Sequence, residues 1–445
     1  MLQTLQQQGL RHVVLCPGSR SGPLALAAAG LKRSGLITLS TAIDERSAGF
    51  HALGRSTASG VATAVITTSG TAVANLLPAA VEADRSSQPL LLISADRPLR
   101  LKNKGANQTV NQEAFLTPVC RWCGSGPLDG LNTGLDHELR ALAQNAWRHL
   151  HQQPGPVHLN VPFEEPLLPD LNQQNAFWNQ WNRSEPEAIT HTPELWTPAS
   201  NNAAPALDPD QPGVIVAGPW RGLSSTLEAY QAALIAWQQR SGWPVLADPL
   251  AAIPNRLSGV IRYWDLLLPH GLSQMPANAQ VLRLGSMPAS RRLEAWLASQ
   301  QGPQLLITEA DPRPLDPLEV AQQWSGGLAE WWQQLSPQLN AIPAGSCAPT
   351  PQTRSVLESW ENADAAVGKR LSALLPIQGA ANEPALRVAL AQLLPAERPV
   401  MLAASSPVRD WQAFAAGDTG RRRCFSFRGA SGIDGTLSLA LGLAA

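Results

Sequence analysis

The sequence predicts an α/β protein made of doubly wound parallel sheets, on three observations. Short apolar runs, such as HVVL (12–15) and LLLIS (90–94), alternate with helical patterns. These runs hold few polar residues, which is typical of strands that are buried on both faces of a parallel sheet. The chain of 445 residues is also too long for one compact core, so two or three domains are expected.

The first domain is expected at residues 1–165. A strand followed by a helix is predicted by HVVLCPG with GPLALAAAGLKRSG, by LITLSTAIDERSAGFHALG and by ATAVITTSGTAVANLLPAAVEADRSS. PLLLISADRP predicts another strand, and ELRALAQNAWRHLHQQPGPVHLNVPFEEPL predicts a helix and a closing strand. Residues 166–212 are rich in Pro, Asn and Gln without sustained periodicity, so we expect a linker there.

Two further α/β domains are expected after this linker. GVIVAG begins the second, at 213–339, which continues through EAYQAALIAWQQRSGWPVLAD, AQVLRLGSMPASRRLEAWLAS and PQLLITEAD. A second linker is expected at 340–355. The third domain, 356–445, is predicted to hold the helices EPALRVALAQLLP and VRDWQAF, the strands RPVMLAASS and RRCFSF, and a last apolar helix in RGASGIDGTLSLALGLAA. Because no stop signal or polar tail follows that helix, we expect this domain to be truncated.

The composition excludes several classes of protein. The formal net charge is −1, so no basic excess points to nucleic acid. The apolar stretches are too short or too interrupted to cross a bilayer, and the N-terminus lacks the pattern of a signal peptide. We therefore expect a soluble cytoplasmic protein that inserts into no membrane.

The cysteines and tryptophans predict little about function. The five cysteines are an odd and sparse set, which does not predict a disulfide framework. Cys120 and Cys123 form a CxxC pair, but no second pair of ligands lies near for structural zinc, so ordinary thiols are expected. Many of the 15 tryptophans lie in Gln-rich helical stretches, and we interpret their number as a feature of composition.

Polar turns follow the predicted strands, where ligands bind in parallel α/β folds. They are PGSRSG (17–22), DER (44–46), TTSGT (67–71), SADRP (94–98) with KNKGANQTVNQ, and, in the third domain, SSPVRD and FRGASGIDG. These turns are rich in arginine, and SRRLEAW adds two more in the second domain. Guanidinium groups bind carboxylates bidentately, so the set predicts a ligand with more than one carboxylate. Each arginine alone could equally cap a helix or form a surface ion pair.

Glu45 is the acidic residue of most interest, since it lies where a strand meets a helix. Its position also fits an ordinary acid in the first turn of a helix, so position alone leaves its role open. The sequence contains no P-loop, no HExxH, no G-x-S-x-G and no convincing G-x-G-x-x-G after the first strand. A nucleotide or nicotinamide enzyme is therefore poorly supported.

Six motifs occur in order and together resemble a known family. They are CPGSRSGPLALA, DERSAGFHALG, TTSGTAVANLLPAAVEA, SADRP, GANQT and RGASGIDG. This pattern resembles the 2-succinyl-5-enolpyruvyl-6-hydroxy-3-cyclohexene-1-carboxylate synthases (the MenD family), a branch of the thiamine-diphosphate-dependent enzymes. The resemblance covers essentially the whole chain, and GANQ with RGASGIDG is specific to this branch.

The resemblance implies a transferase with three domains. Residues 1–165 would bind the aminopyrimidine of thiamine diphosphate, 213–339 would be the central domain, and 356–445 would be the first part of the diphosphate-binding domain. The implied reaction is decarboxylation of 2-oxoglutarate followed by conjugate addition to isochorismate, in menaquinone or phylloquinone biosynthesis. Thiamine diphosphate would serve as the electron sink. Both substrates are dicarboxylates, in agreement with the arginine-rich turns.

The resemblance also implies roles for particular residues. Glu45 would hydrogen-bond the pyrimidine ring nitrogen and promote the imino tautomer of the cofactor. Glu45, Arg20 and Ser19 would be catalytic, and Glu45, Ser69 and Gly70 would bind the cofactor. The substrate pocket would be lined by Ser19, Arg20, Arg97, Asn107, Gln108, Arg291, Arg292, Ser405, Arg409 and Arg428. Arg291 stands where lysine is common in the family, and Ser21 would cap the first helix of the domain.

Some implied features are missing from the sequence. The family holds Mg²⁺ with a GD turn and a later turn that contains Asn, and we expect these ligands beyond residue 445. The chain alone is therefore expected to be inactive. There are two alternatives. One is another thiamine-diphosphate 2-oxoacid decarboxylase or carboligase, and the other is a non-catalytic binding protein. The family further implies a homodimer or homotetramer.

Overall fold

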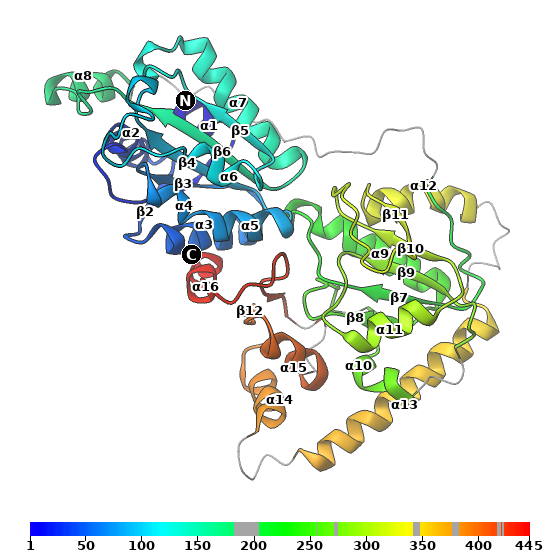
Figure 1. Cartoon of the computed structure of the whole chain (residues 1–445). Helices are drawn as coiled ribbons and strands as arrows, with labels where there is room; N and C mark the ends of the chain where they lie inside the picture. The colour runs from blue at the N-terminus through cyan, green and yellow to red at the C-terminus, as the bar shows by residue number, and fades with distance from the viewer. Residues whose placement is uncertain are drawn as a thin grey trace. The chain divides into compact units, whose positions relative to one another are not determined.

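The computed structural model divides into two compact units (Figure 1). The first unit comprises Met1–Trp196 and Phe427–Ala445, and the second comprises Thr197–Ser426. The structure describes residues 1–181, 204–255, 257–270, 275–340, 348–375, 382–415, 420 and 422–445. The two units are considered separately below.

The first unit is built on a parallel sheet, as predicted. Among the described residues the strand order is β2-β1-β3-β4-β6-β5, and every neighbouring pair is parallel. The three central strands β3, β4 and β6 are buried along their whole length, which agrees with their apolar sequences. The strands are β1 (His12–Leu15), β2 (Thr38–Thr41), β3 (Thr63–Thr67), β4 (Leu90–Asp96), β5 (Trp122–Ser125) and β6 (Pro156–Pro162).

Helices cover both faces of this sheet (Figure 1). The longest of them in the described part of the unit is α7, which packs on β5 and β6 through an apolar stripe. The helices are α1 (Leu2–Gln8), α2 (Gly22–Arg33), α3 (Glu45–Ser59), α4 (Thr71–Ala74), α5 (Leu77–Arg85), α6 (Glu113–Leu116), α7 (Asp136–Gln152), α8 (Leu171–Trp181) and α16 (Thr436–Ala444).

The structure refines three predictions for this unit. The helix predicted after β3 is divided into α4 and α5, and the edge strand β5 was not predicted. Ser21 is the N-cap residue of α2, but its hydroxyl donates to the carbonyl of Gly18 at 3.0 Å instead of capping. The predicted side-chain cap was therefore wrong, and Pro23 at the second helical position has no N–H that could donate to Ser21.

The helix α16 packs closely on α3, although the two lie far apart in the sequence. A Cβ atom on Gly54 would come within 2.2 Å of the carbonyl oxygen of Leu439, and one on Gly442 within 2.0 Å of that of His51. The two backbones approach this closely only because both positions are glycine. Phe50 and Phe427 add an edge-to-face pair, with ring centroids 5.4 Å apart.

Glu82 of α5 holds the loop before α16. Its two carboxylate oxygens accept hydrogen bonds from the backbone N–H groups of Gly429 and Ala430, at 2.8 and 2.7 Å. Glu82 is 4% exposed, so these are buried, charge-assisted bonds. They attach the RGASG motif, including Arg428, to the first unit.

The second unit contains another parallel sheet, of order β11-β10-β9-β7-β8 among the described residues. A short parallel pair, β12 with β13, is separate from it. The strands are β7 (Gly213–Ala217), β8 (Val245–Ala247), β9 (Gln280–Leu284), β10 (Gln304–Ile307), β11 (Gln322–Trp324), β12 (Val400–Met401) and β13 (Cys424–Phe425). The helices are α9 (Leu227–Ser241), α10 (Trp264–Leu267), α11 (Arg291–Ser299), α12 (Leu328–Asn340), α13 (Pro351–Leu374), α14 (Glu383–Leu393) and α15 (Ser406–Phe414).

Tryptophan fills the core of this second sheet. Trp237 of α9 contacts Trp243 and Trp331 edge to face, with ring centroids 5.4 and 4.9 Å apart. All three side chains are fully buried. The interpretation of the tryptophans as a matter of composition was therefore wrong for this cluster, because these large rings supply much of the buried apolar surface.

The compact units differ from the three predicted domains. Residues 356–426 group with the central domain, whereas 427–445 group with the first unit. Both predicted linkers also include helical residues, since α8 lies within 166–212 and α13 begins within 340–355. The three-domain division stays a prediction, and most of the first linker lies outside the described residues.

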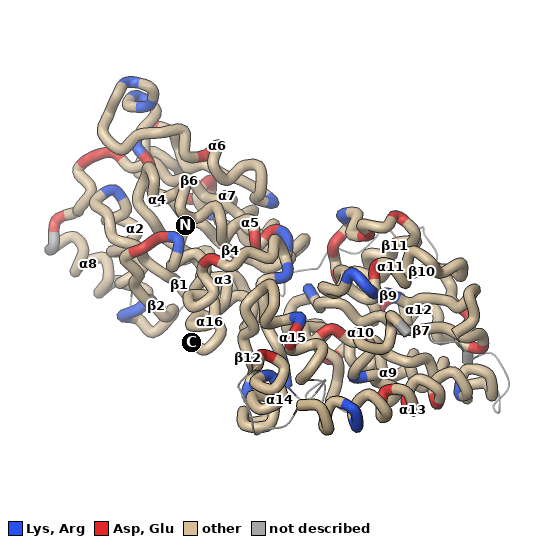
Figure 2. The backbone as a smooth tube through the Cα atoms, turned by 60° about the horizontal axis from the view of Figure 1, so that its bottom comes forward, with Lys and Arg blue, Asp and Glu red and all other residues tan. Residues whose placement is uncertain are grey.

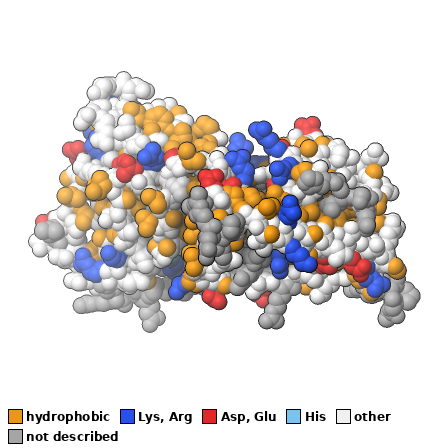
Figure 3. All heavy atoms as spheres, turned by 90° about the horizontal axis from the view of Figure 1, so that it is seen from below, with side chains coloured by type: hydrophobic (Ala, Val, Ile, Leu, Met, Phe, Trp, Pro, Cys, Tyr) orange, Lys and Arg blue, Asp and Glu red, His pale blue; other side chains and the backbone are white. Residues whose placement is uncertain are grey.

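Charge is distributed without a dominant sign. Figure 2 shows acidic and basic positions along the same helices, for example along α13. On the face shown in Figure 3, charged side chains of both signs lie among neutral and hydrophobic ones, and several basic side chains lie near one another. Within the described residues, no helix is both long and apolar enough to cross a bilayer.

His151 in α7 predicts a pH dependence of stability. The ring is 2% exposed, and its Nε2 accepts a hydrogen bond from the Ala62 N–H at 3.2 Å. Burial lowers the pKa of His151 to about 4, against about 6.5 for an ordinary histidine. Between these two values the unfolded chain binds a proton that the folded chain does not. The free energy of unfolding should therefore fall by about 3 kcal/mol as the pH drops from about 6.5 to about 4.

The substitution His151→Gln should remove this part of the pH dependence, because glutamine does not titrate. Urea unfolding at about pH 7 and about pH 4.5 measures the difference. His137→Gln is the matched control for the substitution itself, since His137 is an exposed residue of the same helix. An unaltered profile in His151→Gln would contradict the prediction.

Candidate active site

The polar turns of the first unit lie together at the carboxyl ends of adjacent strands. Glu45, Arg20, Ser69 and Arg97 follow β2, β1, β3 and β4, which are neighbours in the sheet. Parallel strands end at one edge, so this order brings the four turns to the same side. The expectation of a polar edge in this domain is therefore confirmed by the topology.

Glu45 is the first residue of α3 and is half-buried. The preceding residue, Asp44, caps the helix by accepting from the Ser47 N–H at 2.8 Å, so the capping role belongs to Asp44. Burial, and then the nearby carboxylates of Glu45 and Asp44, raise the pKa of Cys16 to about 12. The Glu45 carboxylate therefore lies near the end of β1 without serving as the helix cap.

Two buried arginines approach each other at this edge. Arg20 donates to the carbonyl of Phe163 at 2.8 Å and pairs with Glu165 at 3.3 Å. Its Nε has no hydrogen-bond partner among the described residues, which leaves a buried donor unused. Burial, and then the charge of Arg20, lower the pKa of Arg97. Two guanidinium groups close together favour an anionic ligand.

The Ser69–Gly70 turn packs against Gln108. The Gln108 side chain donates to the Ser69 carbonyl at 2.9 Å, and Arg97 donates to the Ser69 hydroxyl. Gly70 has a φ of 83°, and a Cβ atom there would come within 2.8 Å of the Gln108 side chain. The turn therefore requires glycine, and it connects three of the predicted residues. Ser19 and Asn107 are exposed, and no described side-chain bond joins them to this cluster.

A buried polar network supports this turn, and the sequence analysis did not find it. Gln112 accepts from the Gly70 N–H at 3.0 Å and donates to Asn160 Oδ1 at 2.7 Å. Asn160 donates to Asp96 at 2.8 Å, and Asp96 pairs with Lys102 at 2.7 Å. Gln112 ends the quoted KNKGANQTVNQ segment, and Asp96 precedes Arg97 in SADRP, so both were within motifs already singled out.

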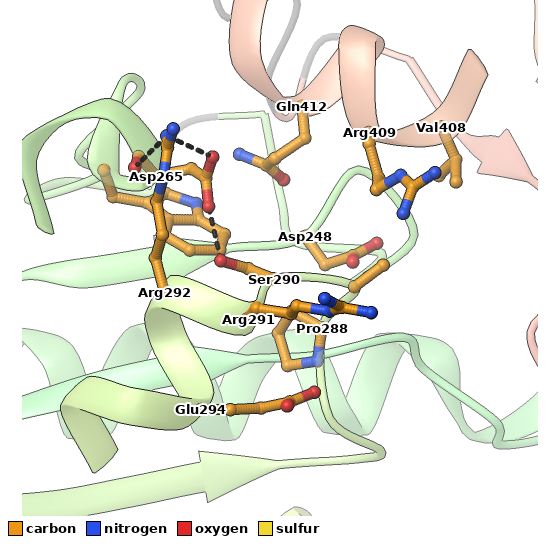
Figure 4. Close-up of a pocket in the computed structure, with 12 residues that line it drawn as sticks. Asp248, Asp265, Pro288, Ser290, Arg291, Arg292, Glu294, Val408, Arg409 and Gln412 are labelled. Atoms are coloured by element: carbon orange, nitrogen blue, oxygen red, sulfur yellow. Dashed lines mark hydrogen bonds and ion pairs between the residues drawn. The ribbon is translucent and has the colours of Figure 1, made fainter. Parts of the chain in front are cut away.

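The second unit contains a cavity of about 400 Å³ (Figure 4). It is lined by residues that include Arg291 and Arg292 of α11, and Arg409 of α15. Figure 4 shows Arg291 and Arg409 on the side of the cavity where Asp248 lies, whereas Arg292 turns towards Asp265. The structure therefore brings together three of the predicted arginines, from segments more than 100 residues apart in the sequence.

The three arginines differ in their partners. Arg292 is held by Asp265, which accepts from it through the backbone carbonyl at 3.1 Å and the carboxylate at 3.3 Å. Arg409 donates to Ser405 Oγ at 3.5 Å, and Ser405 is the N-cap residue of α15 with a φ of 71°. No hydrogen bond or ion pair of Arg291 is found within the described part of the chain. Arg291 and Arg409 are thus better placed than Arg292 to bind a carboxylate.

Ser290 explains how α11 presents these arginines. Its hydroxyl accepts from the Leu293 N–H at 3.1 Å, which caps α11, and donates to Asp265. Asp265 therefore orients both the start of α11 and the Arg292 side chain. Neither Ser290 nor Asp265 was predicted, because they meet only through tertiary contacts.

Comparisons with known proteins show which family this chain belongs to. The model of the N-terminal domain of thiamine pyrophosphate enzymes matches residues 1–115, and the model of their middle domain matches residues 175–402. Over 445 residues the chain is 83% identical to a 2-succinyl-5-enolpyruvyl-6-hydroxy-3-cyclohexene-1-carboxylate synthase from Synechococcus sp. (strain CC9311), covering all of this chain and 77% of that protein. The chain belongs to this synthase family. Synthases of the same name from Synechococcus sp. (strain WH7803) and Prochlorococcus marinus (strain MIT 9313) are 60% and 56% identical over 75% and 76% of their lengths.

Membership in the synthase family confirms the resemblance, the enzyme class and the α/β fold. The predicted thiamine-diphosphate chemistry is supported by the two matched domains. The predicted site residues are divided between the units: Arg291, Arg292, Ser405 and Arg409 lie in the second, and the others, with Arg428, lie in the first. Within the described residues there is no group of three or more His, Cys, Asp or Glu that could hold a metal ion.

Proposed function

We propose that this protein catalyses the synthase reaction of its family. One molecule of 2-oxoglutarate loses its 1-carboxylate as CO₂, and the succinyl carbanion that remains adds to the ring alkene of isochorismate. Formation of the new carbon–carbon bond and uptake of one proton give 2-succinyl-5-enolpyruvyl-6-hydroxy-3-cyclohexene-1-carboxylate. The observation that carries the proposal is the 83% identity to a named synthase over the whole chain.

Bound thiamine diphosphate would stabilise the carbanion that decarboxylation produces. The residues of the first unit are compatible with this cofactor. Glu45 offers a half-buried carboxylate that is not used for capping, and the Ser69–Gly70 turn offers a backbone without a Cβ atom. In this proposal Glu45 hydrogen-bonds the pyrimidine nitrogen through its carboxyl oxygen, and the Ser69–Gly70 turn contacts the ring through its backbone.

The arginines would bind the carboxylates of the two substrates. In the first unit, Arg20 and Arg97 provide two neighbouring positive charges, one with an unused buried donor. In the second unit, Arg291 and Arg409 provide charge at a cavity of about 400 Å³, a volume suited to a small metabolite. Charge-assisted bonds from arginine orient planar carboxylates, so these residues would set the substrate positions. Ser19, Asn107, Gln108 and Ser405 would add neutral donors and acceptors.

Magnesium, a homodimer or homotetramer, and a cytoplasmic location remain part of this proposal. Magnesium and the homo-oligomer rest on the family resemblance, and the cytoplasmic location rests on the sequence pattern. None of the three depends on a distance reported above. Titration of the protein with thiamine diphosphate in the presence and absence of Mg²⁺ would measure the metal requirement, and light scattering would measure the assembly.

The proposal is tested by product formation from isochorismate with two different donors. The assay uses the chain and, in parallel, the chain extended to the length of its relatives. We expect the extended chain to release CO₂ and form product with 2-oxoglutarate, and to form little with pyruvate, because pyruvate lacks the second carboxylate. Preference for pyruvate would instead favour another thiamine-diphosphate carboligase, and binding without turnover in both proteins would favour a non-catalytic role.

Arg409→Ala is expected to raise the KM for one dicarboxylate substrate by about 10- to 100-fold, because a charge-assisted hydrogen bond to its carboxylate is lost. Arg370→Ala is the matched control, because Arg370 is an exposed arginine of α13 and does not line the cavity. Steady-state kinetics in which each substrate is varied in turn would measure the effect. Equal KM values for Arg409→Ala and the control would exclude Arg409 from substrate binding.

A further inference from the structure

A carboxylate of the protein itself is paired with one of the two buried arginines at the sheet edge of the first unit. Arg20 follows β1 and Glu165 follows β6, and Nη2 of Arg20 donates to Oε1 of Glu165 at 3.3 Å. The Arg20 side chain is 8% exposed, whereas that of Glu165 is 70% exposed. The ion pair therefore joins a buried cation to an anion that lies mostly in water.

The contact between Arg20 and Glu165 is weaker than the best pairing of these two groups. Nη1 of Arg20 donates to the Phe163 carbonyl at 2.8 Å, so one end of the planar guanidinium group is fixed by the backbone. Its Nε is buried and has no hydrogen-bond partner among the described residues. Arginine pairs best with a carboxylate through two parallel bonds of about 2.7–2.9 Å. Glu165 makes one longer bond, and a second donor beside it stays unused.

Glu165 also contributes to the charge balance of this edge. Burial, and then the charge of Arg20, lower the pKa of Arg97, and the charges of Asp96 and Glu165 act in the opposite direction. Asp96 is fully buried and pairs with Lys102 at 2.7 Å, so its position is fixed. The Glu165 side chain is mostly solvated already, so it can turn away from Arg20 at little cost in hydration.

We propose that Glu165 is a competing carboxylate, which holds the place of a substrate carboxylate on Arg20 until the substrate displaces it. The inference rests on the proposed function, in which Arg20 binds a carboxylate of one of the two substrates. A substrate carboxylate that used both Nε and Nη2 would form two bonds in place of the single one that Glu165 makes. Because Glu165 belongs to the same chain, it competes at a high effective concentration and lowers the apparent affinity for that substrate.

The test measures the KM for each substrate in the chain extended to the length of its relatives. Glu165→Gln keeps the size of the side chain and removes its charge. We therefore expect the KM for one dicarboxylate substrate to fall by about two- to five-fold, the range expected from an exposed ion pair, with kcat unchanged. Glu164→Gln is the matched control, because Glu164 is the neighbouring carboxylate and pairs with Arg100 at 2.7 Å. This control should leave both KM values unchanged.

Arg20→Ala and the double variant separate this inference from the proposed function. Arg20→Ala should raise the KM for the same substrate, and adding Glu165→Gln to it should cause no further change, because the competing carboxylate then has no arginine to pair with. If Arg20→Ala raised this KM but Glu165→Gln left it unchanged or raised it, the inference would be overturned and the proposed function would stand. If Arg20→Ala left both KM values unchanged, the proposed role of Arg20 in substrate binding would itself be contradicted.

Discussion

Replacing Glu45 with Gln is expected to lower kcat/KM for the synthase reaction by about 10²- to 10⁴-fold, the usual range for loss of a positioned acid or base. Glu45 follows β2 at the edge of the sheet, and its carboxylate is not used to cap α3. Glutamine keeps the size of the side chain but cannot hold or release a proton. The loss should therefore appear mainly in kcat, in the chain extended to the length of its relatives.

Asp44→Asn is the matched control for this prediction. It removes the neighbouring charge but retains a good capping side chain for the Ser47 N–H, so activity should remain close to that of the unsubstituted protein. Titration calorimetry measures the binding of thiamine diphosphate independently of turnover. Glu45→Gln should weaken this binding. If the activity of Glu45→Gln were unchanged, Glu45 would be only an acidic residue in the first turn of a helix.

Replacing Gly54 with Val is expected to destabilise the first unit by about 3 kcal/mol, at the upper end of the cost of overpacking. A Cβ atom at this position would lie 2.2 Å from the Leu439 carbonyl oxygen and 2.9 Å from the Leu443 nitrogen. Both are backbone atoms of α16, so no side chain can move aside. The helix α16 must therefore separate from α3, and the buried apolar contact between them is lost.

Ala58→Val provides the comparison, since Ala58 is an exposed residue of the same helix. It introduces the same β-branched side chain at a propensity cost below about 1 kcal/mol. Urea unfolding would measure both variants, and protease cleavage near Phe427 would report release of α16. Equal stability of the two variants would show that the α3–α16 contact contributes little.

Much of the secondary structure could be predicted because it depends on local patterns. The strands β1, β3, β4 and β7 can be recognised from their continuous apolar runs. Such runs are typical of strands that are buried on both faces of a sheet. The edge strand β5 could not be found this way, because its residues WCGS are only half-buried and carry a weak pattern. The tryptophans of α9 and α12 were misjudged for a related reason, as composition does not reveal which rings meet.

The residues of the candidate site could also be predicted only where they lie in a local sequence pattern. The strand-end turns and the family resemblance predicted Arg20, Glu45, Arg97 and Arg409, because ligand-binding turns follow strands in this fold. The partners of those residues came from elsewhere. Gln112 under the Gly70 turn and Asp265 beside Arg292 are polar residues whose roles depend on a distant contact. No short-range pattern marks such a contact.

The sequence by itself determined the α/β class, the family, and the strand-end turns that carry the arginines and Glu45. These follow from apolar periodicity and from motifs that are continuous in the chain. Only the tertiary structure decided that Glu82 holds the RGASG loop, and that Gly54 and Gly442 let α16 lie against α3. Each of these depends on a contact between residues that lie far apart in the sequence. Such a contact leaves no pattern in either segment alone.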